Sequence, residues 1–260
     1  MKTCVVLALF LMAGVSLADI QKRIIGGKRC TPQEEQHYVF LQTRNGTHTS
    51  ICSGSVIGRE KTSSWVLTAA HWDMGGPSFT VKSADRSVTQ TVGRPQTFKH
   101  PTADVMLLRL RRPLTPIRLA TDAECTALRN LVKPSNPVTF RITARDTQAE
   151  DDYFKYGGGV NPYVTMCATI TVDRLEPFND VLEHTNQISQ NECCRGRTAA
   201  PAGCKMCGGD SGSGFIYKDA LYAVFTETWI WGTPVFDIND IGFTVCDTDV
   251  RKWIKQLTGL

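Results

Sequence analysis

The segment GGDSGSG, residues 208–214, places Ser211 between an aspartate and a glycine in a run that holds four glycines. Glycine lets the backbone turn tightly and lets a second chain approach closely. Such a run also leaves main-chain N–H groups free to face a reacting carbonyl. Ser211 is therefore a candidate nucleophile, although a Gly/Ser turn without chemistry accounts for the segment equally well on its own.

Two segments upstream carry residues that such a serine would need. WVLTAAH at 65–71 ends a strand-like run with His71, and ADVMLLRL at 103–110 opens an apolar run with Asp104. A serine hydroxyl is a weak nucleophile until a base accepts its proton, and a buried aspartate is costly without a partner. Taken singly, His71 fits a structural histidine and Asp104 a surface residue at a strand end. Together with Ser211 they indicate a nucleophile, a base and an orienting acid.

RIIGG at 23–27, LTAAH, DVMLLRL and GDSG follow one another in the order and approximate spacing of the chymotrypsin/trypsin family. The chain resembles that family from Arg23 to its C-terminal end, and the order His, Asp, Ser is the family's own. The resemblance implies an all-β fold of two packed six-stranded antiparallel β-barrels with a C-terminal α-helix. It places His71 and Asp104 in the first barrel and Ser211 in the second.

The residue pattern itself also favours an all-β barrel or sandwich. Short β-rich runs punctuated by turn residues are found at 38–42, 53–57, 64–68, 105–110, 138–142, 163–172, 214–217 and 221–226. One helix is predicted at the C-terminus, where a cap, an apolar stripe and a stop succeed one another. Its cap and first turn are Asp247, Thr248 and Asp249, its stripe is Val250, Trp253, Ile254 and Leu257, and its stop is Gly259.

The resemblance implies a serine-type endopeptidase, a hydrolase that works through an acyl-enzyme. Ser211 would attack the peptide carbonyl, His71 would act as base and then acid, and Asp104 would hold the imidazole. The N–H groups of Gly209 and Ser211 would form the oxyanion hole. The alternative is a weak or inactive homologue with a binding or regulatory role, which the altered surroundings of the triad leave open.

The first residues predict export and processing. Lys2 precedes an almost wholly apolar stretch at 5–15 and small residues at 16 and 18, which is typical of a signal peptide over 1–18; a signal anchor is the alternative. Residues 19–23 would be an activation propeptide, leaving a protease domain over 24–260. The resemblance implies that cleavage after Arg23 would free the Ile24 ammonium to pair with Asp210. We therefore expect a secreted, extracellular zymogen, with Asn45 in a glycosylation sequon.

Composition limits the partners. The 260 residues carry a formal charge of +4 without a dense basic run, so nothing favours nucleic acid. We expect protein or peptide substrates, an activating protease and protein inhibitors as partners, no membrane partner, and a monomer. No acidic cluster resembling the family's calcium loop is found at 75–102, so neither a metal nor a cofactor is expected.

Ten cysteines suit an oxidising compartment, and loss of Cys4 with the signal peptide would leave nine, an odd number. Trp72 stands where the family has a cysteine, so Cys52 is the candidate free thiol. The resemblance implies two disulfides, and one group of cysteines has no assigned pairing. The disulfides are Cys30 with Cys167 and Cys125 with Cys246; the group is Cys193, Cys194, Cys204 and Cys207.

The specificity pocket departs from trypsin. The position six residues before the serine lies at the pocket base in this family, and here it holds Lys205 rather than aspartate. A buried lysine would repel basic side chains, so acidic residues before the cleaved bond are one expectation. A Lys205 turned to solvent, leaving an apolar or blocked pocket, is the other. The remaining pocket residues implied by the resemblance are Met206, Thr226 and Thr228.

Overall fold

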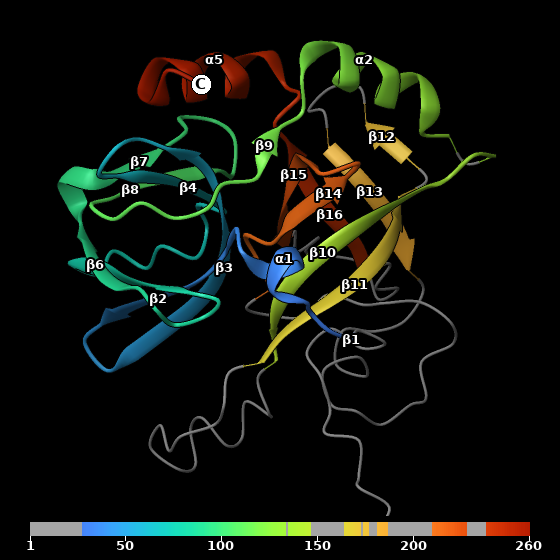
Figure 1. Cartoon of the computed structure of the whole chain (residues 1–260). Helices are drawn as coiled ribbons and strands as arrows, with labels where there is room; N and C mark the ends of the chain where they lie inside the picture. Colours follow the sequence, from blue (N-terminus) through green and yellow to red (C-terminus); the bar gives the residue numbers. More distant parts are fainter. Residues whose placement is uncertain are drawn as a thin grey trace, which may run out of the picture.

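The polypeptide forms two strongly curled β-sheets that lie side by side, with two of its helices along one end (Figure 1). This computed structural model describes residues 28–133, 135–146, 164–172, 174–176, 181–186, 210–227 and 238–260. The two-barrel, mostly β architecture expected from the sequence is confirmed. No helix within the described ranges is long and apolar enough to cross a membrane.

The first sheet is built mainly from hairpins between consecutive strands, and all of its pairs are antiparallel. Its order is β6-β5-β2-β3-β4-β8-β7. Gly46, with φ +61°, allows the two-residue turn between Asn45 and its partner His48. The strands are β2 Tyr38–Asn45, β3 His48–Arg59, β4 Ser64–Thr68, β5 Ser78–Ser83, β6 Thr89–Gly93, β7 Thr97–Lys99 and β8 Met106–Leu110.

The second sheet follows the order β1-β11-β10-β14-β15-β16-β13-β12, and β9 pairs with β15 in parallel. In the described part of the chain, each sheet has six strands of at least four residues, and the remaining strands are two or three residues long. The strands are β1 Lys28–Arg29, β9 Arg118–Leu119, β10 Val138–Asp146, β11 Val164–Val172, β12 Arg174–Glu176, β13 Val181–Asn186, β14 Gly214–Tyr217, β15 Ala220–Glu227 and β16 Ile238–Thr244.

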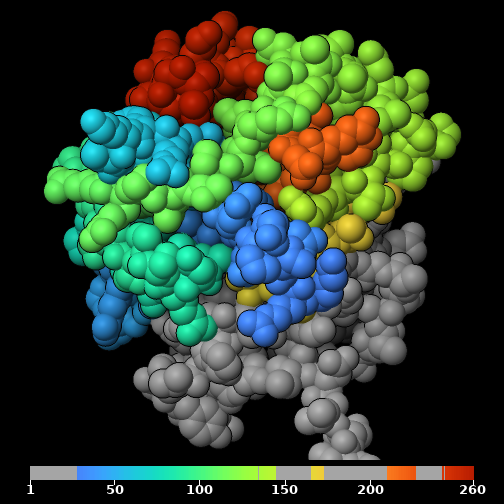
Figure 2. Space-filling view, in the orientation of Figure 1, coloured from blue at the N-terminus to red at the C-terminus, as the bar shows by residue number. Residues whose placement is uncertain are grey.

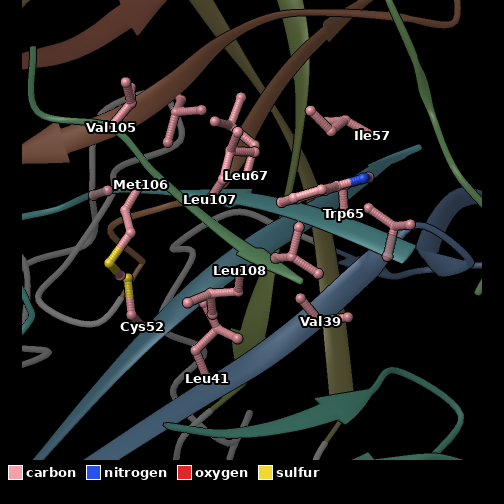
Figure 3. Packing of buried hydrophobic residues seen from close by; sticks show 14 of the residues in the cluster. Val39, Leu41, Cys52, Ile57, Trp65, Leu67, Val105, Met106, Leu107 and Leu108 are labelled. Carbon is pink, nitrogen blue, oxygen red and sulfur yellow. The ribbon is translucent and has the colours of Figure 1, made fainter. Parts of the chain in front are cut away.

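Two apolar clusters form the core, one centred on each sheet, and the first also includes Ile216, Leu221 and Val224 from the second sheet. In the first sheet, side chains from β2, β3, β4 and the start of β8 pack together (Figure 3). On β8 the buried leucines flank the exposed Arg109, so the strand keeps its charge outside. In the second sheet, Phe140 lies between 5.7 and 6.0 Å, centroid to centroid, from three aromatic rings: Phe215, Tyr217 and Tyr222. Burial of these apolar surfaces is the main favourable term for both sheets.

The described part of the chain also contains three α-helices. The predicted C-terminal helix is confirmed as α5 Thr248–Thr258, capped by Asp247 and ended by Gly259 at φ +76°. Its apolar stripe packs on the core of the first sheet. The C-terminal end of the chain therefore covers the sheet that the N-terminal half of the chain builds. The short α1 Pro32–Glu35 and the longer α2 Asp122–Leu131 both begin with a capping box. Figure 2 shows α5 and the segment around α2 as one continuous surface at that end.

A connecting segment passes from the first sheet to the second before α2. The N–H of Ile117 donates to Val56 O of β3, and the N–H of Ala120 donates to Leu221 O of β15. These bonds join one strand from each sheet. The eight strand runs predicted from sequence all coincide with strands, whereas the sequence did not predict α1, α2, the polar strands β5 and β6, β13, β16 or the strands of two or three residues.

Candidate active site

His71 and Asp104 are brought together by neighbouring strands of the first sheet. β4 ends at Thr68, which pairs with Met106, the first residue of β8. The residues after β4 and those before β8 therefore lie at the same end of the sheet. His71 follows β4 in a turn closed by the N–H of Asp73, which donates to Ala70 O at 3.2 Å. Asp104 lies two residues before β8, at this end.

The Asp104 carboxylate is held by three contacts. Oδ1 accepts the N–H groups of Ala70 at 2.9 Å and of His71 at 2.7 Å. Oδ2 lies 2.6 Å from His71 Nδ1. The side chains of His71 and Asp104 are 37% and 24% exposed. With the proton on Nδ1 donated to Asp104, Nε2 is left with its lone pair facing away from the carboxylate.

Ser211 comes from the second sheet, three residues before β14. Gly212 beside it has φ +84°, and a Cβ there would lie 1.9 Å from Ser53 O, so no larger residue fits. The Gly212 N–H donates to Phe225 O of β15 at 2.8 Å. On the other side, Ser211 O accepts the Ser53 N–H of β3 at 2.7 Å. The serine is thus anchored to both sheets.

His71 Nε2 lies 3.1 Å from Ser211 Oγ, although the two residues are 140 positions apart in sequence. Ser211, His71 and Asp104 therefore form one continuous chain of hydrogen-bonding groups across the junction of the sheets. A base with its lone pair on a serine hydroxyl, and oriented by a carboxylate, is the arrangement that activates a nucleophile. The structure brings together all three residues that the sequence singled out.

The other predicted site residues have different outcomes. Asp210 is buried beside Ser211 at 1% exposure, and Thr226 is buried on β15. Asn45 is exposed in the β2–β3 turn, where its side-chain amide donates to Met74 O at 2.8 Å. The rest lie outside the described residues: Arg23, Ile24, Lys205, Met206, Gly209 and Thr228, with Cys193, Cys194, Cys204 and Cys207.

The described cysteines form two disulfides and one free thiol. Cys30 is bonded to Cys167, and Cys125 to Cys246. Cys52 is unpaired and fully buried. Trp72, which stands in place of a cysteine, is buried and packs edge-on against Phe79 with ring centroids 5.0 Å apart.

An ion network just after His71 was not predicted. The Asp73 carboxylate, 2% exposed, accepts two hydrogen bonds from Arg94 at 2.6 and 2.8 Å and lies 2.9 Å from Lys99 Nζ. Burial alone would raise the pKa of Asp73, but these two cations outweigh it and lower that pKa to about 2. No motif links Asp73 to residues 21 positions or more along the chain, so only the fold reveals the network.

A buried histidine lies at the junction of the sheets. His37, just before β2, is 2% exposed, and neither ring nitrogen has a hydrogen-bond partner among the described residues. Burial, and secondarily the charge of Arg141 on β10, lowers the pKa of His37 to about 4. Across the described ranges, no three His, Cys, Asp or Glu side chains are grouped so as to hold a metal ion.

Comparison with known proteins identifies a family and several relatives. The family model described as Trypsin matches residues 24–254. Snake venom serine proteinase 14 of Crotalus adamanteus is 26% identical over 267 residues, which span 97% of this chain and 94% of that protein. HL collagenase superposes with a TM-score of 0.62 at 17% identity, covering 90% and 98% of the two chains. An inactivated protease paralogue of the scabies mite superposes at 0.56 and 16% identity, covering 89% and 98%. At such identities the two structural likenesses show the fold alone.

Proposed function

The chain belongs to the trypsin family of serine-type endopeptidases, and on that premise we propose that Ser211, His71 and Asp104 are its catalytic triad. One observation carries this proposal. Ser211 Oγ, the two ring nitrogens of His71 and the Asp104 carboxylate are linked by separations of 3.1 and 2.6 Å. General-base catalysis needs hydrogen-bond reach of about 2.6–3.2 Å between the nucleophile and its base.

The chemistry follows from that order of contacts. Ser211 Oγ attacks the peptide carbonyl while His71 Nε2 accepts the hydroxyl proton. The imidazolium then gives this proton to the leaving amine, and water, deprotonated by the same nitrogen, hydrolyses the acyl-enzyme. Asp104 stabilises the imidazolium and keeps the ring in place through Nδ1. The N–H groups of Ser211 and Gly209 stabilise the oxyanion; removing one such donor typically costs about 3–4 kcal/mol of barrier.

The protease is made as a secreted zymogen under this proposal. A signal peptide over 1–18 and a propeptide over 19–23 are removed, and the new ammonium of Ile24 pairs with Asp210. Three observations support it: the family match begins at residue 24, the carboxylate of Asp210 is buried next to Ser211, and the relatives include a snake venom protein. A buried carboxylate is stabilised by a cationic partner. Asn45, exposed in its turn, carries the glycan.

Substrate preference is assigned to Lys205. A cation at the base of the pocket selects acidic side chains before the cleaved bond and rejects basic ones. Thr226, buried on β15, contributes a small polar wall. Met206 and Thr228 complete the pocket in this proposal.

The test compares the chain cleaved after Arg23 with two matched variants, Ser211→Ala and the uncleavable Arg23→Gln, on a peptide library. We expect hydrolysis after acidic residues by the cleaved chain only, and a loss of about 10⁴-fold or more in Ser211→Ala. Full activity of Arg23→Gln would contradict the activation step. A strong preference for Arg or Lys would contradict the pocket assignment. No hydrolysis by cleaved, folded protein would contradict catalysis and favour a binding role.

A further inference from the structure

We propose that Cys52 is a positioning residue for Ser211, and that its free thiol fixes the main chain of the nucleophile by donating a hydrogen bond to the Ser211 carbonyl oxygen. This inference rests on the proposed role of Ser211. It goes beyond the triad because it assigns a function to a sulfur that the hydrolytic steps do not use. The residue acts through Ser211 and touches no substrate.

Two donors from consecutive residues of β3 meet the Ser211 carbonyl. The Ser53 N–H lies 2.7 Å from this oxygen, and Cys52 Sγ also lies 2.7 Å from it. β3 is the neighbour of β4, the strand that leads to His71. The strand pair that sets the position of the base therefore also sets the orientation of the serine's main chain.

Thr68 determines where the thiol proton goes. Its Oγ1 lies 3.4 Å from Cys52 Sγ and donates its own proton to Ser53 O at 2.7 Å. Because the Thr68 hydroxyl gives its proton to Ser53 O, it accepts rather than donates toward the sulfur, and the thiol keeps its own proton to donate. The Ser211 carbonyl oxygen is the nearer acceptor and has no proton of its own, so the thiol donates to it.

The thiol stays protonated in this position. Cys52 is fully buried in the same apolar cluster as Met106 (Figure 3). Burial, the largest effect, raises the pKa of the Cys52 thiol above its ordinary range. A thiolate would instead set a negative charge against the carbonyl oxygen and repel it. The low-polarity surroundings therefore preserve the donor.

The unpaired state of Cys52 is what makes this donor possible. A sulfur in a disulfide has no proton, so it cannot donate a hydrogen bond. Here the position of the second cysteine is taken by Trp72, which is 4% exposed and packs against Phe79. The unpaired Cys52 keeps a thiol that reaches from the first sheet to the main chain of Ser211.

The expected effect falls on turnover. If the Ser211 carbonyl loses one of its two donors, the peptide unit can rotate and carry Oγ away from His71 Nε2. Misplacement of a reacting group by about 1 Å can cost about 100-fold in rate. With the Ser53 N–H still in place, we expect a smaller shift and a loss of about tenfold in kcat, with KM unchanged.

The test measures kcat and KM per active site, titrated with a serine-reactive phosphonate, on the full chain cleaved after Arg23. Cys52→Ala removes the donor, Cys52→Val removes it while filling the space, and Cys52→Ser restores a donor. Ser55→Ala is the matched control, because Ser55 is buried on the same strand and its hydroxyl has no hydrogen-bond partner in the described residues. We expect kcat to fall about tenfold in the Ala and Val variants and to return to within about threefold in Cys52→Ser.

Two results would overturn the inference. One is an unchanged kcat per titrated site in Cys52→Ala or Cys52→Val, since a merely structural thiol lowers the folded fraction and not the turnover of folded enzyme. The other is a Cys52→Ser variant as slow as Cys52→Ala. If Cys52→Ala does not fold, the comparison of Val with Ser decides. A wild-type chain that the phosphonate does not label would instead refute the proposed nucleophile.

Discussion

The sheet that leads to His71 and Asp104 mostly pairs strands that follow one another in sequence, whereas the sheet beside Ser211 holds two disulfides across 137 and 121 residues. Within the described part of the first sheet the one cysteine, Cys52, is free. Closing a long loop costs more conformational entropy than closing a hairpin. Covalent links are therefore found where distant segments must meet, and the first sheet relies on packing and on the Asp73 ion network.

The largest expected effect is on the disulfide that joins α2 to the end of the second sheet. Replacing both Cys125 and Cys246 by alanine should lower the free energy of unfolding by about 4 kcal/mol, because the link closes a long loop in the unfolded chain. Denaturant unfolding measures the total loss in the free energy of unfolding. Hydrogen exchange should show lost protection in α2 and β16 before β2 and β3. Equal loss in both sheets would contradict the division between them.

The second largest expected effect is a pH dependence of stability, and it comes from His37 at the junction of the sheets. His37 has a pKa of about 4 in the folded chain, below the ordinary value of 6.5, so the unfolded chain binds more protons between these values. Stability is therefore complete above about pH 6.5 and falls as the pH is lowered to about 4, by up to about 3 kcal/mol. His37→Phe should flatten the stability curve in this window. His48→Gln, at the exposed start of β3, is the control and should keep the slope.

A smaller loss of stability is expected when the ion network after His71 is broken. Asp73→Asn leaves Arg94 and Lys99 without their carboxylate, but both cations are more than a third exposed, so we expect a loss of about 2 kcal/mol. Because the pKa of Asp73 is lowered to about 2, its contribution is present above about pH 4 and is lost as the pH falls toward 2.

The control for Asp73 is an exposed ion pair of the same sheet. Glu60 and Arg109 are 43% and 48% exposed, so Glu60→Gln should change stability by clearly less than Asp73→Asn does. Thermal unfolding of the two variants at neutral pH gives the comparison. Equal losses would mean that the Asp73 network is no stronger than a surface pair.

Much of this fold was predictable because its signals are local or strongly patterned. The apolar runs of β4 and β8 and the capped stripe of α5 depend on neighbouring residues. The polar strands β5 and β6 carry a weaker pattern and are set by pairing with β2 and with each other. The helix α2 was missed although Thr121 and Glu124 form a capping box, a sequence signal that could have found it.

The residues of the candidate site also differ in how well the sequence predicts them. His71, Asp104 and Ser211 could be singled out because three short motifs carry them in a characteristic order. The contacts that support them could not, since they join residues far apart in sequence. Cys52 reaches Ser211 across 159 positions and Asp73 reaches Arg94 across 21, and neither pair belongs to a motif. Such contacts depend on which strands become neighbours.

The central claim is that His71 activates Ser211 as a nucleophile. Mass spectrometry of the chain cleaved after Arg23, treated with a serine-reactive phosphonate, tests it most directly, with His71→Ala as the matched variant. We predict a single adduct on Ser211 in the wild type and labelling slower by about 10³-fold or more in His71→Ala. No adduct on folded, cleaved protein, or equal labelling of the two proteins, would contradict the account.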